Sequence, residues 1–263
     1  TDLLAGLDLV YPELTTVPAA DGFRLPARIC WPAGFDPARR YPVIVNPYGG
    51  PSAPTVRDGF AGGSGLFDQV LARAGYVVFN VDPRSAAAIA KKLENTVVRN
   101  VWSDNELADL LAGVRWLKAQ SWVDPERVGI WGWSGGGTFT VLAMTRSTEF
   151  KAGIAVAALV DGRFYDTKFE EAYMKTPADN PEGYERIALH RGAKDLHGRL
   201  MLVHGTYDDN VHPQNLWMTV DELVKAGKQF NMLVYPMRQH GISDKAAQKH
   251  LYAAMLEFWK MYL

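Results

Sequence analysis

Short apolar runs rich in valine and isoleucine alternate along this chain with longer segments of helical period. Strands buried on both faces of a parallel sheet form continuous apolar runs, whereas the helices that connect them carry one apolar face. The alternation therefore predicts an α/β protein that has a mostly parallel sheet with helices on both faces. The predicted strands are 42–46, 76–81, 128–133, 152–157, 200–204 and 230–235.

A further apolar segment, 23–30, precedes these strands, and prolines lie in it and shortly after it. Because proline cannot donate a ladder hydrogen bond, we expect this segment to be an edge strand. The length fits one α/β domain over residues 1–263, with residues 1–40 as a lead-in segment that includes the edge strand. The β-α rhythm breaks over residues 161–196, which we interpret as an insertion that determines specificity.

Three helices have recognisable ends in the sequence. Ser103 and Glu106 have the spacing of a capping box. Pro213 can open a second helix, which Gly227 would end. Ser243 is the expected N-cap of a C-terminal helix.

Charge and composition exclude several classes of protein. The chain has 28 Lys and Arg against 29 Asp and Glu, interspersed, so we expect no nucleic-acid binding. No apolar stretch reaches the roughly 18 residues that span a bilayer. The single cysteine, Cys30, excludes an internal disulfide but does not distinguish a periplasmic from a cytoplasmic location. The chain begins at Thr1 without a methionine or a leader, so we expect a processed chain or a fragment of a longer one.

The motif Gly-x-Ser-x-Gly occurs at 132–136, between the predicted strand 128–133 and a run from Thr138 that is compatible with a helix. A turn this tight strains its central residue, so the flanking positions need glycine. The turn would expose the Ser134 hydroxyl at a helix N-terminus, where backbone N–H groups favour an oxyanion. The motif predicts that Ser134 is a nucleophile; the alternative is a glycine-rich turn with an ordinary N-cap serine.

A serine nucleophile needs a histidine base and an acid, in the chain order Ser, Asp or Glu, His. The predicted strand 200–204 is followed by Asp208 and Asp209, and His240 follows the next strand. Open α/β sheets build their sites past the carboxyl ends of strands. We therefore expect Ser134, one of the two acids and His240 to form a triad.

The remaining histidines have simpler explanations. His204 and His212 flank the acidic loop, and a metal site with Asp208 is the alternative that they allow. The chain has no spacing typical of a metal motif, so we expect hydrogen bonding within the loop, no metal and no cofactor. The histidines expected to be solvated surface side chains are His190, His197 and His250.

An oxyanion hole needs a second donor, usually from the loop after an earlier strand. The segment 47–51 follows the predicted strand 42–46, and it contains Tyr48. Tyr48 can donate through its phenol or its backbone N–H. The alternative is a Gly-Pro turn with a core tyrosine.

In these landmarks the sequence resembles the prolyl oligopeptidase family of serine peptidases, and most closely its dipeptidyl peptidase IV branch. The resemblance covers about residues 40–260 and implies an α/β-hydrolase fold. The segments that carry it are 41–45, 48–51, 132–134, 153–157, 165–166, 173–174, 204–206, 208–212 and 240–241. The roles that it implies are nucleophile for Ser134, triad acid for Asp208, base for His240, and oxyanion donors for Tyr48 and the Gly135 N–H.

The resemblance also implies residues that bind substrate. Asn210 would hold the substrate carbonyl one residue before the scissile position. Tyr165, Phe169 and Val211 would wall a small apolar pocket suited to proline or alanine. Tyr165 and Phe169 are four residues apart, so on one helix they would share a face; a core stripe is the alternative.

The sequence departs from the family pattern at three points. Gly135 stands where this branch usually has a tyrosine after the nucleophile, and residues 82–85 read Asp-Pro-Arg-Ser where Asp-Gly-Arg-Gly is usual. Family members also carry an N-terminal β-propeller, to which nothing in this chain corresponds. The resemblance therefore implies the catalytic portion alone.

These observations predict a serine hydrolase that cleaves peptide bonds through an acyl-enzyme, preferring proline or a small residue before the scissile bond. A carboxylic-ester hydrolase on the same fold is the first alternative, because the same triad serves both reactions. A catalytically silent interaction domain is the second, and the intact triad argues against it. Besides a peptide substrate, the partners that we consider are an N-terminal β-propeller in the parent chain and a second copy of this chain.

Overall fold

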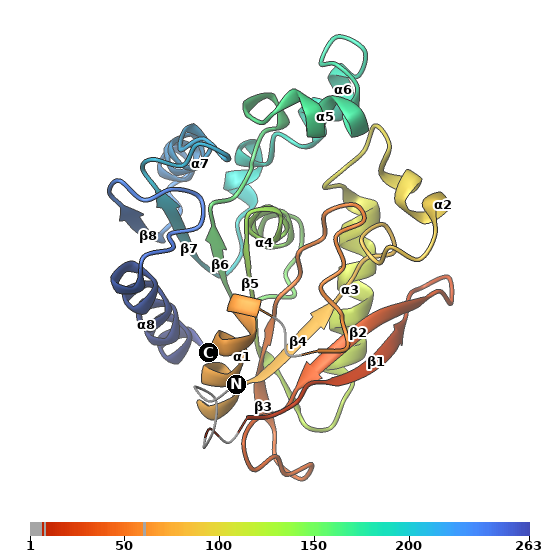
Figure 1. Cartoon of the computed structure of the whole chain (residues 1–263), viewed down its shortest axis with the longest axis vertical. Coiled ribbons are helices and arrows are strands. Elements are labelled where there is room, and N and C mark those ends of the chain that lie inside the picture. Colours follow the sequence, from red (N-terminus) through yellow and green to blue (C-terminus); the bar gives the residue numbers. More distant parts are fainter. Residues whose placement is uncertain (1–6, 8, 60–61) are drawn as a thin grey trace.

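The computed structural model describes residues 7, 9–59 and 62–263 (Figure 1). Residues 1–6 and 8 of the expected lead-in segment lie outside this part. The described chain forms one eight-stranded sheet in the order β1-β2-β4-β3-β5-β6-β7-β8, which is parallel from β4 to β8. The strands are β1 (Glu13–Pro18), β2 (Arg24–Cys30), β3 (Tyr41–Val45), β4 (Val77–Val81), β5 (Val123–Trp133), β6 (Ala152–Val156), β7 (Arg199–Gly205) and β8 (Phe230–Tyr235).

Helices cover both faces of the sheet, as the alternating pattern predicts. Side chains of α3, α4 and α7 belong to the core on one face, and side chains of α1 and α8 belong to the core on the other. The mostly parallel α/β architecture is therefore confirmed. The helices are α1 (Gly62–Arg73), α2 (Lys91–Glu94), α3 (Asp104–Lys118), α4 (Gly135–Arg146), α5 (Thr167–Met174), α6 (Pro181–Arg186), α7 (Gln214–Lys225) and α8 (Lys245–Tyr262).

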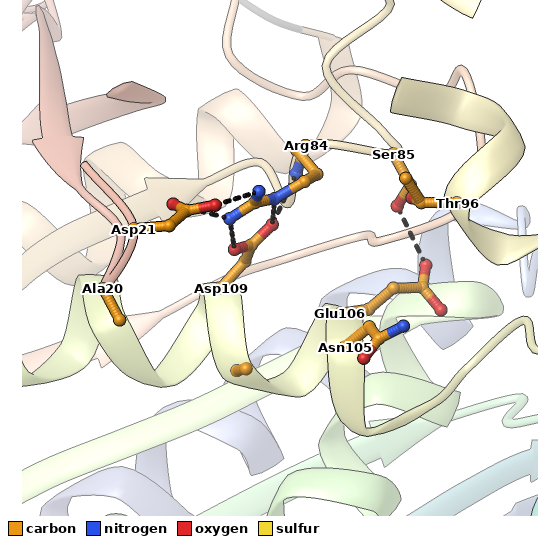
Figure 2. A pocket seen from close by; sticks show the side chains of 9 residues that line it. Ala20, Asp21, Arg84, Ser85, Thr96, Asn105, Glu106 and Asp109 are labelled. Atoms are coloured by element: carbon orange, nitrogen blue, oxygen red, sulfur yellow. Dashed lines mark hydrogen bonds and ion pairs between the residues drawn. The ribbon is translucent and has the colours of Figure 1, made fainter. Parts of the chain in front are cut away.

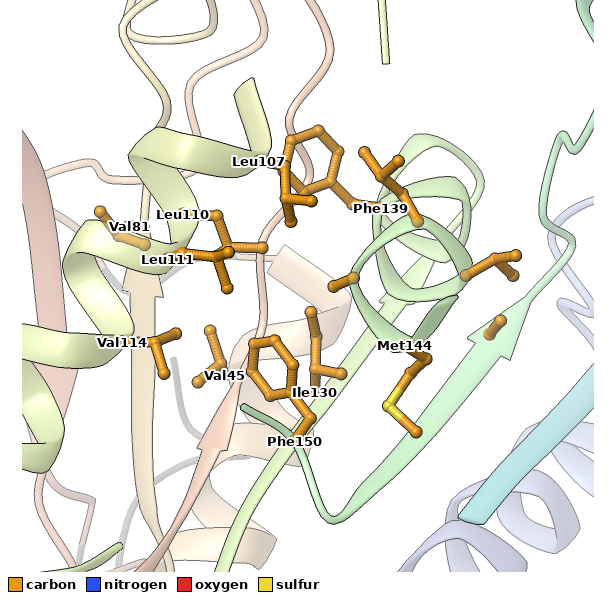
Figure 3. Close-up of a cluster of buried hydrophobic side chains, with 14 of the residues drawn as sticks. Val45, Val81, Leu107, Leu110, Leu111, Val114, Ile130, Phe139, Met144 and Phe150 are labelled. Carbon is orange, nitrogen blue, oxygen red and sulfur yellow. The ribbon is translucent and has the colours of Figure 1, made fainter. Parts of the chain in front are cut away.

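Successive residues of the central strands enter opposite cores. On β3, Val43 and Val45 pack under α3 and α4, whereas Ile44 faces the core beneath α1 and α8. This follows from the two-residue period of a strand, and it explains why consecutive residues of the central strands are apolar where both faces are covered. Figure 3 shows part of the first core, where α3 contributes Leu107, Leu110, Leu111 and Val114, and α4 contributes Phe139 and Met144.

The expectation of an edge strand at 23–30 is wrong. The segment forms β2, but β1 lies outside it and is the edge of the sheet. Pro26 is tolerated because the pairing with β4 covers only Ala27 to Cys30. The Pro26 carbonyl still accepts a hydrogen bond from the Asp82 N–H, at 3.1 Å.

The predicted helix ends are confirmed in two cases out of three. Ser103 and Glu106 form the capping box of α3, and Gly227 follows α7 with a φ of 66°. The expected N-cap at Ser243 is wrong by one residue. Asp244 caps α8, because its carboxylate accepts the Ala247 N–H at 3.0 Å.

The segment 161–196 is irregular and partly helical, as expected. It leaves the sheet after β6 and contains α5, α6 and two 3₁₀ segments, η3 (Gly162–Phe164) and η4 (Leu189–Asp195). Figure 1 shows α5 and α6 beyond the carboxyl ends of the central strands. The segment is therefore placed where parallel sheets build their sites.

Leu110 tests the core beneath α3. Its side chain is fully buried, so we expect Leu110→Ala to lower the free energy of unfolding by about 2–5 kcal/mol through lost burial and a residual cavity. Leu66→Ala is the control, because Leu66 is 49% exposed and its loss should change stability by less than about 0.5 kcal/mol. Urea unfolding measures both, and equal losses would contradict the described core.

Candidate active site

Ser134 is the single residue between β5 and α4. Its φ of 57° and ψ of −120° are unfavourable for a residue with a side chain. The neighbouring elements hold this conformation: the Ser134 N–H donates to the Val156 carbonyl at 2.8 Å, and the Ser134 carbonyl accepts from the Thr138 N–H at 2.9 Å. Strain of this kind persists only where the surrounding structure imposes it, and it is typical of functional sites.

The glycines of the motif are required by close backbone contacts. A Cβ at Gly132 would collide with the carbonyl group of Gly136. A Cβ at Gly136 would lie 2.5 Å from the Pro47 carbonyl oxygen. The turn therefore excludes side chains on both sides of Ser134, as the motif predicts.

Asp208 and His240 are brought together from the loops after β7 and β8. The His240 Nδ1 lies 2.9 Å from the Asp208 Oδ2. An ionised carboxylate can only accept, so Nδ1 carries the proton and donates it. This tautomer leaves Nε2 of His240 unprotonated and able to take a proton.

The Asp208 carboxylate is buried and fully surrounded by donors. Its Oδ1 accepts the N–H groups of Asn210 at 3.0 Å and Val211 at 2.9 Å. Burial raises the pKa of Asp208, but hydrogen bonds from His204 and His240 outweigh it and hold the pKa well below its usual value. The carboxylate is therefore a fixed negative charge beside His240.

Of the two adjacent acids, only Asp208 contacts the histidine. Asp209 is exposed, whereas the Asp208 side chain has no exposed surface. His204 supports Asp208: its Nε2 lies 2.8 Å from the Val211 carbonyl and 3.2 Å from Oδ2 of Asp208. The sequence placed His204 in this hydrogen-bonded loop but gave no sign that it contacts the acid.

The loop that carries His240 is tied to the serine turn. The indole N–H of Trp133, the residue before Ser134, donates to the His240 carbonyl at 2.8 Å. In the described part of the chain, no hydrogen bond joins the Ser134 hydroxyl to the His240 ring. Catalytic hydrogen bonds are often long in a free enzyme and shorten when substrate binds.

A cavity of about 140 Å³ opens in front of Ser134. Its walls come from five separate parts of the chain: the loop after β3, the residue before the N-cap of α3, the serine turn with the start of α4, the segment after β6, and the loop after β7. The lining residues that the sequence predicted are Tyr48, Gly135, Tyr165, Phe169 and Val211, and those that it missed include Trp102, Thr138 and Leu159.

Tyr48 and the two aromatic residues of the insertion, Tyr165 and Phe169, line this cavity. Tyr48 is 36% exposed, and a Cβ at Gly135 would lie 3.2 Å from its ring. Tyr165 and Phe169 do not share a helix face as expected, because α5 begins only at Thr167. Their rings still meet edge to face, with centroids 5.8 Å apart. The core interpretation is therefore wrong for Tyr48 and Tyr165, whereas Phe169 lines the cavity and also packs against the core.

Asn210 is exposed and is not among the residues that line the cavity, although its neighbour Val211 is. Its backbone N–H is bound to Asp208, and its side chain forms a hydrogen bond with the Tyr165 phenol. Burial raises the pKa of Tyr165, and the Asn210 bond opposes that rise. The amide and the phenol are thus two neighbouring polar groups beside an otherwise apolar pocket.

A second cavity, of about 340 Å³, lies beside α3 (Figure 2). Arg84 crosses it and binds two carboxylates, Asp21 at 2.6 Å and Asp109 at 2.8 Å. Deeper in, the Ser85 hydroxyl donates to Glu106 at 3.1 Å. Arg84 thus pairs with one carboxylate in the β1–β2 turn and with one on α3. We infer that these ion pairs hold the turn against the helix.

The expected surface position of His190 is wrong. His190 is 4% exposed and lies in η4, where its Nδ1 is 3.9 Å from the Asp161 carboxylate. His197 and His250 are exposed as expected, and His250 also binds the Tyr235 phenol. His212 is exposed, and its Nδ1 accepts the Gln214 N–H at 3.2 Å.

Within the ranges that the structure covers, no three His, Cys, Asp or Glu side chains are grouped so that they could hold a metal ion. None of the described helices combines the length and the apolar character that crossing a membrane requires.

The serine turn on a mostly parallel sheet, with an acid–histidine pair at the ends of the next strands, defines the α/β-hydrolase class. A comparison with family models matches residues 67–263 to the prolyl oligopeptidase family. The chain belongs to that family. The expected fold and family are therefore confirmed.

Individual relatives agree with this assignment. The chain is 38% identical over 231 residues to a Coccidioides posadasii protein named "Probable dipeptidyl-aminopeptidase B", covering 86% of this chain and 25% of the relative. It is 36% identical over 256 residues to the Uncinocarpus reesii protein of the same name, covering 96% and 27%. The crystal structure of Porphyromonas gingivalis dipeptidyl peptidase 4 superposes with a TM-score of 0.94 at 35% identity, covering 100% of this chain and 37% of that one. The chain spans about a quarter of the length of the curated relatives.

The contact between Asp208 and His240 predicts unequal effects for the two adjacent acids. We expect Asp208→Asn to lower kcat by about 10⁴-fold, because an amide donor facing Nδ1 forces the wrong tautomer on His240. Asp209→Asn should leave kcat nearly unchanged. Steady-state kinetics with thermal midpoints for both variants measure this, and a collapse confined to Asp209→Asn would reverse the assignment.

Glu106 gives a second prediction, on the pH dependence of stability. Burial raises the pKa of Glu106 to about 8, so its carboxyl group binds a proton more tightly in the folded protein than in the unfolded chain. The stabilisation is complete below pH 4.5 and is lost as the pH rises through about 8, with a slope of up to about 1.4 kcal/mol per pH unit. In Glu106→Gln, which keeps the capping box, the contribution of Glu106 to this slope should be absent, and that of Glu170, whose pKa burial also raises to about 8, should remain.

Urea unfolding of wild type and Glu106→Gln between pH 5 and 9 measures the difference. Parallel curves would show that Glu106 does not hold its proton in the folded state.

Proposed function

We propose that this chain is the catalytic part of a serine peptidase that cleaves peptide bonds through an acyl-enzyme on Ser134. The observation that carries the proposal is the 2.9 Å contact between Asp208 and Nδ1 of His240. It fixes the tautomer in which Nε2 can take a proton, on a loop that Trp133 ties to the serine turn. Fold and family support the same activity.

In the proposed first step, the Ser134 oxygen attacks the scissile carbonyl carbon while its proton passes to Nε2 of His240. The Asp208 charge stabilises the resulting imidazolium. The Gly135 N–H, at the N-terminus of α4, and Tyr48 donate to the oxyanion. The C–N bond then breaks, and His240 returns the proton to the leaving amine.

In the second step, water attacks the acyl-enzyme. His240 takes a proton from the water, and the Ser134 oxygen leaves with that proton as the acid product departs. No other group is needed for proton balance. The same two steps would hydrolyse an ester, so the leaving group is decided by experiment.

The cavity supports a preference for proline or a small residue before the scissile bond. Its volume of about 140 Å³ and its apolar and aromatic lining suit a short apolar side chain. We propose that Asn210 binds the carbonyl of the residue before the scissile position, since its side chain lies beside the Tyr165 phenol. The relatives are named as dipeptidyl peptidases, which suggests that this chain's peptide substrate is cleaved after its second residue. That this chain has an N-terminal β-propeller in a longer parent chain, or a second copy of itself, as a partner stays a prediction.

Ser134→Ala tests the nucleophile. We expect a fluorophosphonate probe to label wild type and not the variant, and kcat for an alanyl or prolyl anilide to fall by about 10⁶-fold. Ser147→Ala is the control, because Ser147 lies at the other end of α4 and binds the Ala143 carbonyl. Labelling that persists in Ser134→Ala would remove Ser134 from the mechanism.

The same assay with a nitrophenyl ester separates the alternatives. Turnover of both substrates supports the peptidase, and turnover of the ester alone supports an esterase. Absence of both, with no labelling, supports a silent interaction domain.

A further inference from the structure

Trp102 lies in the cavity wall next to the nucleophile, although no motif of the sequence points to it. It precedes the N-cap of α3, its side chain is 4% exposed, and it lines the cavity in front of Ser134. A Cβ built on Gly135 would lie 2.7 Å from Cη2 of the indole and 3.4 Å from Cζ2. The ring edge therefore occupies the space that a side chain at position 135 would need.

We propose that Trp102 is a specificity-determining residue, whose indole limits the cavity to a small residue before the scissile bond. This inference rests on the proposed function, because it names what sets the width of that function's pocket. Gly135 and Trp102 form a complementary pair: the glycine leaves a gap beside the nucleophile, and the indole fills it from another part of the chain.

The backbone at Trp102 is strained and is held from the α3 side. Its φ of 54° is unfavourable for a residue with a large side chain. The buried Glu106 carboxylate accepts the backbone N–H groups of Trp102 and Ser103, the latter at 3.2 Å. The capping box of α3 therefore also fixes the residue that carries the indole.

The same loop is held from the insertion. The Arg99 N–H donates to the Tyr173 carbonyl at 2.7 Å, and the Val101 N–H donates to the Met174 sulfur at 3.3 Å. Tyr173 and Met174 end α5, the helix that carries Phe169 on the opposite wall. The loop that carries Trp102 and the helix that carries Phe169 are thus joined by two hydrogen bonds, one to a backbone carbonyl and one to a side-chain sulfur.

The packing of the indole indicates that its shape matters more than its polar group. The ring meets Phe139 edge to face, with centroids 5.9 Å apart. The indole Nε1 is buried and has no hydrogen-bond partner among the residues that the structure describes. An unpaired buried donor costs free energy, so a hydrogen bond does not explain a tryptophan here. The large ring beside Gly135 explains why this position has a tryptophan.

The test compares substrates that differ only in the residue before the scissile bond. Dipeptides that end in alanine, leucine or phenylalanine are offered as nitrophenyl esters and as anilides to wild type, Trp102→Ala and Trp102→Phe. We expect Trp102→Ala to raise the ratio of kcat/KM for phenylalanine over alanine by about tenfold or more, with Trp102→Phe in between. Trp217→Ala, on the outer side of α7 where Trp217 is 47% exposed, should leave the ratio unchanged.

A reciprocal variant tests the pairing with Gly135. Gly135→Ala keeps its backbone N–H but places a methyl group against the indole, so kcat/KM for the alanine substrate should fall. In the Trp102→Ala background the same change should cost at least several-fold less. Equal costs in both backgrounds would contradict the pairing.

The outcomes separate this inference from the proposed function. Equal losses on all substrates in both Trp102 variants, with an unchanged ratio, would overturn the specificity role and leave a structural one. If wild type hydrolyses the esters but no anilide, the proposed peptidase function is wrong. The ratios of kcat/KM for the esters would still test whether Trp102 determines specificity. Thermal midpoints and fluorophosphonate labelling identify a variant that fails to fold, and Trp102→Phe then decides.

Discussion

The site depends on one strained residue held between two regular elements. Ser134 keeps a left-handed backbone only because the Val156 carbonyl binds its N–H and the Thr138 N–H binds its carbonyl. The first partner belongs to the neighbouring strand β6 and the second to α4. The conformation that exposes the hydroxyl is therefore maintained by the central sheet, and its cost is met by packing that most of the chain contributes to.

Much of this architecture follows from local sequence. The central strands contain runs of consecutive apolar residues because they are buried on both faces, so the places of these runs could be predicted from the sequence. The glycines around Ser134 and the acid and histidine after β7 and β8 could be predicted because local turn chemistry and strand ends determine them. Asp208 and His240 do meet in the structure.

Other features depend on contacts that no local pattern encodes. Pro26 suggested an edge strand, but pairing on its far side by β1 is a long-range event. His190 sits in a polar segment of sequence, yet the insertion folds back and buries it beside Asp161. Trp102 precedes a capping box, which predicts a helix start and says nothing about which cavity the preceding side chain enters.

The crowding around Asp208 has a consequence for how the site responds to change. One carboxylate binds His240 through Oδ2 and the N–H groups of Asn210 and Val211 through Oδ1. The Asp208 carboxylate therefore both orients the His240 ring and holds the loop that carries Val211. A change at this acid would therefore alter affinity and turnover together, whereas Phe169 on α5 and Trp102 before α3 can change the pocket without touching the acid or the base.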